Sequence, residues 1–231
     1  MFRLIRLFHT SIGSKLMMAT SGLVLVVFLT GHLLGNMKVF QGPEALNEYA
    51  AWLQGHPLLW VIRLTMLSIF LLHVVNGVRL AIENRAARPQ RYLHPATVQT
   101  NFAARHMMFS GVLVLSFLVY HLLHLTLGAV EPQFAQLLDA KGRVDVYARV
   151  VLGFSDPWIT GSYLVALVLL GLHLQHAIGS LVQTLGFNHE SYQRLICNLV
   201  WLLVVSLVVG FASIPLSVWF GWVTISGGIQ P

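Results

Sequence analysis

The chain has 231 residues, of which 56% are hydrophobic and only 10% are charged. So few charges cannot cover the surface of a water-soluble globule of this length, so the composition indicates an integral membrane protein without a separate soluble domain. The single cysteine, Cys197, excludes a disulfide framework and a thiolate metal cage, and the excess of 14 basic over 8 acidic residues indicates topology rather than a nucleic-acid surface.

Apolar segments make up most of the chain. Residues 1–14 are a mixed basic and apolar lead-in, which predicts an amphipathic stretch on the membrane face and no cleavable signal peptide. Five later segments are long enough to cross a hydrocarbon core of about 30 Å, and they cover residues 15–37, 57–84, 101–127, 157–186 and 192–218. We therefore expect an all-α membrane protein with five transmembrane helices, in a single domain over residues 1–231 and with no internal repeat.

The connections between the spans indicate the orientation of the chain. Phe40 to Gln54 predicts an amphipathic surface helix with Pro43 in its first turn, and Glu131 to Asp156 predicts a cap of short helices and turns. The face that holds the N-terminus and the loop from Glu83 to Arg105 carries nine of the basic residues, against five on the other face. The positive-inside rule therefore places the N-terminus in the cytoplasm and the C-terminus outside.

Histidines occur in four of the predicted spans. An ionisable side chain at membrane depth is costly, so it normally faces a bundle interior or a bound group. One histidine on each of four consecutive helices is typical of a four-helix bundle that holds axial ligands in its interior. The six histidines in question are His32 in the first span, His73 in the second, His121 and His124 in the third, and His173 and His176 in the fourth.

The spacing of these histidines gives their depth, because a helix rises about 1.5 Å per residue. His32 and His121 follow the basic residue that opens their span by 17 and 16 residues, so both lie roughly 24 Å from the expected cytoplasmic edge. His73 and His173 each follow a span-opening proline by 16 residues, so both lie roughly 24 Å from the outer edge. Two level pairs predict two bis-histidine haems b, an outer one on His32 and His121 and an inner one on His73 and His173.

Other interpretations of the histidines stay open at this point. His124 and His176 come three residues later in their helices, roughly 28 Å along them, and are expected to be haem-edge or interfacial groups. A single helix-interior histidine can also simply bond a neighbour's backbone carbonyl. Zinc would gather its ligands at one level, and a proton relay would usually include carboxylates inside the spans, which have no deep Asp or Glu.

Haem propionates are anions and need donors near a membrane face. The candidates are Arg79 and Arg105, followed by Lys15 and Ser21. Glycines beside the paired histidines would let a flat group approach, although ordinary close helix packing explains them equally well. The positive-inside rule alone would also explain the cations.

Four segments in order resemble the dihaem cytochrome b membrane anchor of succinate:quinone oxidoreductases and quinol:fumarate reductases. The resemblance covers nearly the whole chain and implies a five-helix anchor of a bacterial cytoplasmic membrane with two haems b. It puts His32, His73, His121 and His173 on the family's ligand positions. The segments are SGLVLVVFLTGHLLGN (Ser21 to Asn36), LLHVVNGVRLAIENRAARP (Leu71 to Pro89), FLVYHLLHLTLG (Phe117 to Gly128) and GLHLQHAIGSLVQTLG (Gly171 to Gly186).

The resemblance also implies partners and a task. The partners would be a flavoprotein with covalent FAD and an iron-sulfur protein on the cytoplasmic face, in a complex that can be oligomeric. This chain, with no catalytic residue of its own, would pass electrons between the iron-sulfur protein and a membrane quinone, expected to be menaquinone, through the inner and then the outer haem. Some members carry a proton-linked carboxylate just before the ligand of the fourth span, where this chain has Gly171 and Leu172.

Quinone chemistry needs a proton donor or acceptor beside an apolar cleft near a haem. Glu44 is the first choice near the outer haem, and Asn36, Lys38 and Tyr49 are the other candidates. Near the inner haem, His106 and Arg105 could serve instead. Two rival functions remain: a b-type cytochrome of a hydrogenase or formate dehydrogenase, and a haem-free transporter or assembly factor whose histidines merely pack.

Overall fold

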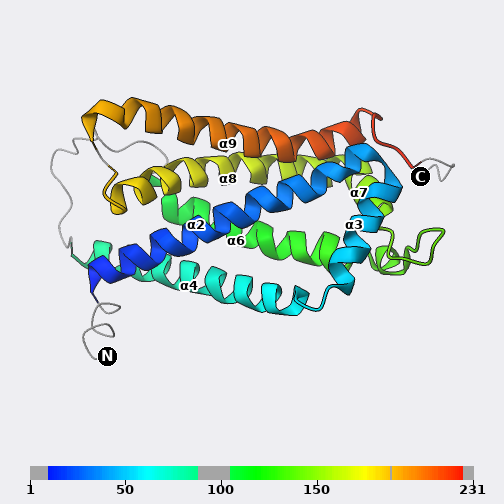
Figure 1. Ribbon diagram of the computed structural model, residues 1–231, viewed down its shortest axis with the longest axis horizontal. Helices are drawn as coiled ribbons and strands as arrows, with labels where there is room; N and C mark the ends of the chain where they lie inside the picture. Colours follow the sequence, from blue (N-terminus) through cyan, green and yellow to red (C-terminus); the bar gives the residue numbers. More distant parts are fainter. Residues whose placement is uncertain (1–9, 88–104, 188, 226–231) are drawn as a thin grey trace. The chain divides into compact units, whose positions relative to one another are not determined.

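The computed structural model describes residues 10–87, 105–187 and 189–225, and the chain is largely helical there. Five of the helices are long and apolar enough to cross a membrane, with α6 counted together with the π-helix η2 (Leu122–Thr126) that continues it. This finding confirms the predicted all-α membrane fold with five spans. The long helices are α2 (Ser11–Asn36), α4 (Leu59–Ala86), α6 (Met107–His121), α8 (Pro157–Thr184) and α9 (Glu190–Trp219) (Figure 1).

The first long helix begins earlier than the sequence suggests. α2 starts at Ser11, so the end of the predicted surface stretch over residues 1–14 already belongs to the span. Thr10 marks this start because its Oγ1 accepts a hydrogen bond of 3.0 Å from the backbone N–H of Gly13, as an N-cap side chain does. The rest of the lead-in, the first residues of the predicted third span and most of the basic loop lie outside the described residues.

Residues at the two ends of the fourth span explain where helix α8 begins and where it ends. Asp156 precedes α8 and accepts a hydrogen bond of 2.7 Å from the backbone N–H of Trp158, and Pro157 takes the first helical position, where its missing N–H costs nothing. At the other end Gly186 has a φ of 86°, which a glycine adopts without strain, and it stops the helix.

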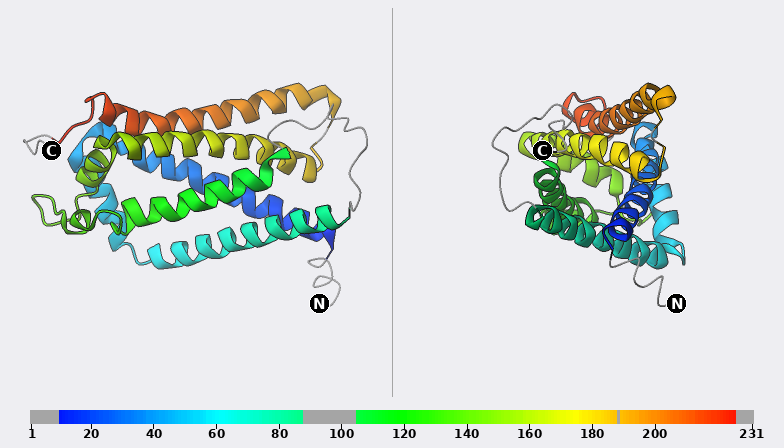
Figure 2. Two further views of the ribbon diagram at one scale, coloured as in Figure 1. Left: turned by 180° about the vertical axis from the view of Figure 1, so that it is seen from behind. Right: turned by 90° about the vertical axis from the view of Figure 1, so that its left-hand side faces the viewer.

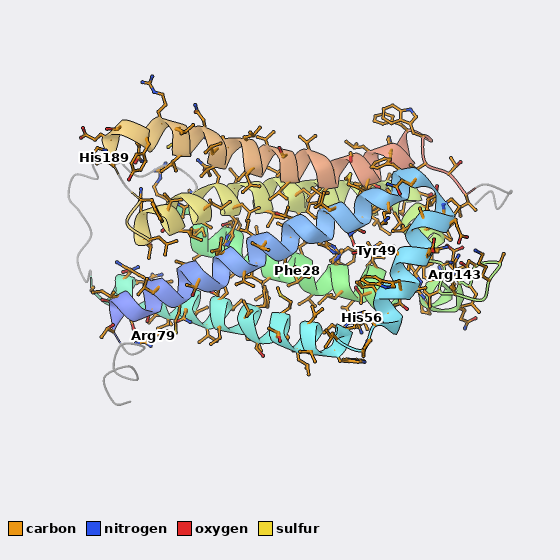
Figure 3. The ribbon with its side chains drawn as sticks, in the orientation of Figure 1. Phe28, Tyr49, His56, Arg79, Arg143 and His189 are labelled. Atoms are coloured by element: carbon orange, nitrogen blue, oxygen red, sulfur yellow. The ribbon has the colours of Figure 1, made fainter. Side chains whose placement is uncertain are left out.

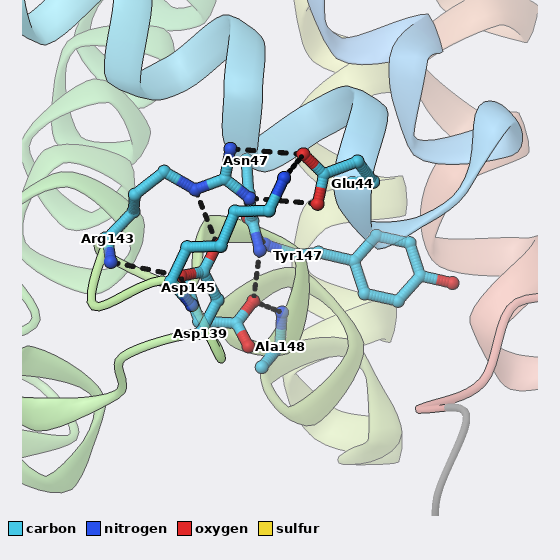
Figure 4. A network of polar contacts seen from close by, with 8 residues as sticks. Glu44, Asn47, Asp139, Arg143, Asp145, Tyr147 and Ala148 are labelled. Carbon is cyan, nitrogen blue, oxygen red and sulfur yellow. Dashed lines mark hydrogen bonds and ion pairs between the residues drawn. The ribbon is translucent and has the colours of Figure 1, made fainter.

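Two short helices lie in the connections, as predicted. α3 (Pro43–Gly55) begins on Pro43, and α7 (Val146–Ser155) follows the 3₁₀ segment η3 (Pro132–Gln136). Asn47 of α3 donates a hydrogen bond of 2.9 Å to the Asp145 carboxylate and accepts one of 2.9 Å from the Tyr147 backbone N–H (Figure 4). Asn47 therefore ties α3 to the first turn of α7.

The helices contribute to two compact units, and Figure 2 shows the helices from two further sides. The first unit is drawn from Met1–Leu29, Val61–Gly111 and Leu172–Val204. The second unit is drawn from Thr30–Trp60, Val112–Gly171 and Val205–Pro231, and it contains α3, α7 and a buried aromatic and aliphatic core that includes Phe154, Tyr163 and Ile214.

Candidate functional site

The first unit holds the predicted inner pair, His73 and His173. Ser21 of α2 reaches His73 of α4, with 3.2 Å between Oγ and Nδ1. Ser110 of α6 reaches His173 of α8 with the same distance of 3.2 Å between the same two atoms. Each predicted inner ligand therefore has one ring nitrogen held by a serine from a neighbouring helix.

The second unit holds the predicted outer pair, His32 of α2 and His121 of α6. Their ring centres lie 6.0 Å apart and the ring planes are at 88°. Two imidazoles on opposite sides of one metal ion, each about 2 Å from it, have ring centres about 6 Å apart. The spacing of this pair therefore fits two axial ligands of one iron.

Tyr163 of α8 joins His121 to His124 in the second unit. Its hydroxyl lies 2.9 Å from Nδ1 of His124 and 3.4 Å from Nδ1 of His121. His124 is fully buried, and its expected role as a haem-edge or interfacial group stays a prediction. It lies in the π-helix η2, which widens the turn after His121 and changes the direction of the side chains that follow.

The buried space around His124 leaves one polar atom without a partner. Nε2 of His124 has no hydrogen-bond partner among the described residues. A Cβ added to Gly153 of α7 would lie 2.9 Å from this atom, so the glycine makes room for the ring. The sequence shows the histidine but neither the role of Gly153 nor that of Tyr163.

The predicted quinone residues separate into two groups. Tyr49 points from α3 toward α2, where a Cβ on Gly35 would lie 2.7 Å from its hydroxyl oxygen (Figure 3). The Lys38 ammonium lies 5.7 Å from the centre of the Tyr49 ring, and the Asn36 amide nitrogen lies 3.4 Å from Nδ1 of His32. Three of the four candidates thus gather at the end of α2 that carries His32.

Glu44 belongs to a different set of contacts. Its carboxylate forms ion pairs of 2.7 Å with Lys141 and 3.0 Å with Arg143, and Arg143 also pairs with Asp139 at 2.6 Å (Figure 4). The hydrogen bonds from Lys141 and Arg143 hold the pKa of the Glu44 carboxyl below its ordinary value. A carboxylate held in its charged form is a poor proton donor at neutral pH.

The predicted propionate donors differ in their contacts. Lys15 and Arg105 are exposed, and Nε of Arg79 pairs with Glu83 one turn along α4 at 2.7 Å (Figure 3). Ser21 is buried and faces His73. Ser14 is not among the donors predicted from the sequence. Its fully buried hydroxyl has no hydrogen-bond partner among the described residues and would suit an anionic oxygen.

These observations test whether the histidine pairs suit a haem. In the described part of the chain, no three His, Cys, Asp or Glu side chains gather as a metal cage. A metal held by a pair of histidines therefore needs further ligands from a bound group, and a porphyrin supplies four. The ring spacing of one pair, the serine partners of the other and the unpartnered Ser14 hydroxyl all fit that group.

Comparison with known proteins gives one match. The family model described as succinate dehydrogenase/fumarate reductase transmembrane subunit matches residues 2–104, a stretch that takes in α2, α3 and α4 and therefore His32 and His73. This match agrees with the resemblance noted in the sequence over that part of the chain. No curated protein and no solved structure matches the chain.

Proposed function

We propose that the chain is a member of the family of succinate dehydrogenase/fumarate reductase transmembrane subunits, whose model matches residues 2–104, and that it is a dihaem cytochrome b anchor. The family implies a flavoprotein and an iron-sulfur protein as partners. Two haems b bound to this chain would carry single electrons between the iron-sulfur partner and a membrane quinone. The proposed orientation puts the N-terminus in the cytoplasm of a bacterium.

The spacing of His32 and His121 carries this proposal. The distance of 6.0 Å between the ring centres fits one iron between two imidazoles. Edge-to-face packing of rings gives a similar spacing, so the haem content of the purified chain decides between the two. The proposed ligands of the second haem are His73 and His173, which are supported by matching serine contacts.

Several side chains have proposed roles around these ligands. Tyr163 orients His121, because a hydroxyl that donates to His124 at 2.9 Å can accept from Nδ1–H of His121. That acceptor leaves Nε2 of His121 free to bind iron. Ser14, Arg79 and Lys15 would supply donors to propionates on the cytoplasmic side, with Arg105 and His176 as further candidates at that edge.

A quinone site near the outer haem is proposed at Tyr49 rather than at Glu44. The Tyr49 hydroxyl can donate a proton and lies beside the helix that carries His32, while Lys38 offers a positive charge for a developing oxyanion. Glu44 is held as a carboxylate by its ion pairs. The substrate would be a membrane quinone such as menaquinone.

Tyr163→Phe is expected to make the outer haem easier to reduce. Loss of the hydroxyl leaves Nδ1–H of His121 without an acceptor, which lowers the basicity of the ligand and favours ferrous iron. A redox titration should show a rise in the reduced fraction of this haem alone, on the order of a few-fold at a fixed potential because the 3.4 Å contact is long. Tyr120→Phe, whose ring stacks on His124, is the matched control. Equal shifts in both variants would contradict the role of Tyr163.

Tyr49→Phe is expected to slow the oxidation of the reduced outer haem by quinone, because the phenolic proton that the reduced quinone would take up is lost. The loss of a positioned proton donor costs about 10²-fold or more in rate. Rapid-mixing measurements with a soluble quinone analogue, added to protein whose haems have been reduced beforehand, would follow the haem absorbance in Tyr49→Phe and Glu44→Gln. If Glu44→Gln is slow and Tyr49→Phe is normal, Glu44 is the proton donor, as the sequence analysis prefers.

The proposed function is tested by reduction of the haems in the assembled complex. The chain should purify with its flavoprotein and iron-sulfur partners, and quinol should reduce haem absorbance that belongs to this chain. A complex that assembles with a colourless membrane anchor would contradict the proposal and favour a purely structural role.

A further inference from the structure

Each of the two inner histidines contacts a Ser-Gly dipeptide on a neighbouring helix. Ser21 and Gly22 face His73, and Ser110 and Gly111 face His173. Both serine Oγ atoms lie 3.2 Å from Nδ1. A Cβ added to either glycine would lie 3.4 Å from Cε1 of the facing ring, so each ring rests against the bare backbone of the neighbouring helix.

The direction of these hydrogen bonds follows from the single proton of each serine. The hydroxyl of Ser21 donates to the Met18 carbonyl at 3.1 Å, and that of Ser110 donates to the Met107 carbonyl at 3.0 Å. A hydroxyl has one proton but two lone pairs, so an Oγ that donates to the carbonyl accepts from the histidine. Nδ1 of His73 and of His173 therefore carries the proton, and the lone pair of Nε2 is left for iron.

The sequence contains the same arrangement twice. Ser21-Gly22 stands eleven residues before His32 on α2, and Ser110-Gly111 stands eleven residues before His121 on α6. Eleven residues are about three turns, so the dipeptide and the histidine lie on one face of each helix. The expectation of no internal repeat is wrong at this level, because SGLVLVVFLTGHLL and SGVLVLSFLVYHLL align without a gap.

We propose that Ser21 and Ser110 are twin positioning residues that fix the tautomer and the orientation of the two inner haem ligands. The inference rests on the proposed haem ligation. Under this proposal α2 and α6 each have two roles. Each helix supplies a ligand to the outer haem and a hydrogen-bond acceptor to a ligand of the inner haem. The two faces of the inner haem would then be held by one repeated device.

The test is a redox titration of the purified full-length protein with Ser21→Ala and Ser110→Ala. An acceptor on Nδ1–H raises the basicity of a metal-bound imidazole, and outer-shell partners of metal ligands are worth about tenfold or more. Each variant should raise the ratio of reduced to oxidised inner haem about tenfold at a fixed potential, equal to about 59 mV for one electron. The outer haem should not change.

Matched variants separate this role from a general effect on packing. Ser116 of α6 also donates to its own backbone, at 3.0 Å from the Val112 carbonyl, but it is exposed and has no histidine partner, so Ser116→Ala should leave both haems unchanged. Ser21→Thr and Ser110→Thr keep the oxygen and should restore the inner potential and the resonance Raman spectrum of the inner haem.

The possible outcomes are decisive. Full haem content with an unchanged inner potential in both alanine variants would overturn the inference. If an alanine variant loses the inner haem, recovery in the threonine variant supports the role, and continued loss with the outer haem intact contradicts it. A wild-type protein without haem would overturn the proposed function itself.

Discussion

Replacing His73 or His173 with alanine is expected to remove one and the same haem and to leave the other in place. The two imidazoles lie in one compact unit, each with a serine of a neighbouring helix at 3.2 Å from Nδ1. An iron that loses one of two protein ligands loses most of its protein-derived binding energy. Replacing His32 or His121 should remove the other haem, because their rings form the second pair. Haem content per chain, measured by absorbance after reduction, checks both halves of this prediction.

His176→Ala is the control for this series. His176 is half-buried and lies one turn beyond His173 on α8, so its loss should leave two haems. The assignment of the fourth span would be wrong if the His176 variant lost a haem and the His173 variant kept both. It would also be wrong if variants of His73 and His173 lost different haems.

Asn47→Ala is expected to have the largest effect on stability among single changes outside the histidine pairs. Asn47 is 1% exposed, and both ends of its amide are used, by the Asp145 carboxylate and by the Tyr147 backbone N–H. Truncation leaves a buried N–H without an acceptor and removes a charge-assisted bond, for a loss of about 2–4 kcal/mol. The measurement is thermal unfolding of the purified protein in detergent.

Glu48→Ala offers the matched control for Asn47, because Glu48 is exposed on the same helix. It should unfold close to the wild-type temperature, since exposed substitutions away from such contacts have small effects. Equal stability of the two variants would show that the junction of α3 and α7 does not depend on the Asn47 amide.

The spans and the proximity of His32 to His121 could be predicted from the sequence because both depend on distances that the backbone fixes. Hydropathy over about 20 residues defines a span, and a constant rise per residue converts spacing to depth. His32 and His121, placed level by counting, do come together in the structure.

Contacts between remote segments could not be predicted in this way. Glu44 forms hydrogen bonds with Lys141 and Arg143, which follow it in the sequence by 97 and 99 residues. Nothing near Glu44 in the sequence indicates those partners. The π-helix at Leu122–Thr126 could not be predicted either, because one widened turn does not change the hydropathy pattern of an apolar segment. His124 lies in this segment and is fully buried.

The two Ser-Gly dipeptides can be found in the sequence, but their contacts with histidines could not be predicted from it. A serine in an apolar helix commonly bonds its own backbone, as Ser21 and Ser110 both do. Only the neighbouring helix shows that the remaining lone pair of each oxygen faces a histidine. Two matching contacts at 3.2 Å distinguish this arrangement from ordinary packing.

The most direct test of the account is the number and ligation of haems in the purified wild-type chain. Pyridine haemochrome analysis with protein quantitation gives haems per chain, and near-infrared magnetic circular dichroism of the oxidised protein identifies the axial ligands. Two haems per chain, both with bis-histidine ligation, is the expected result. A haem-free chain, a single haem, or a haem with an axial ligand other than histidine would contradict it.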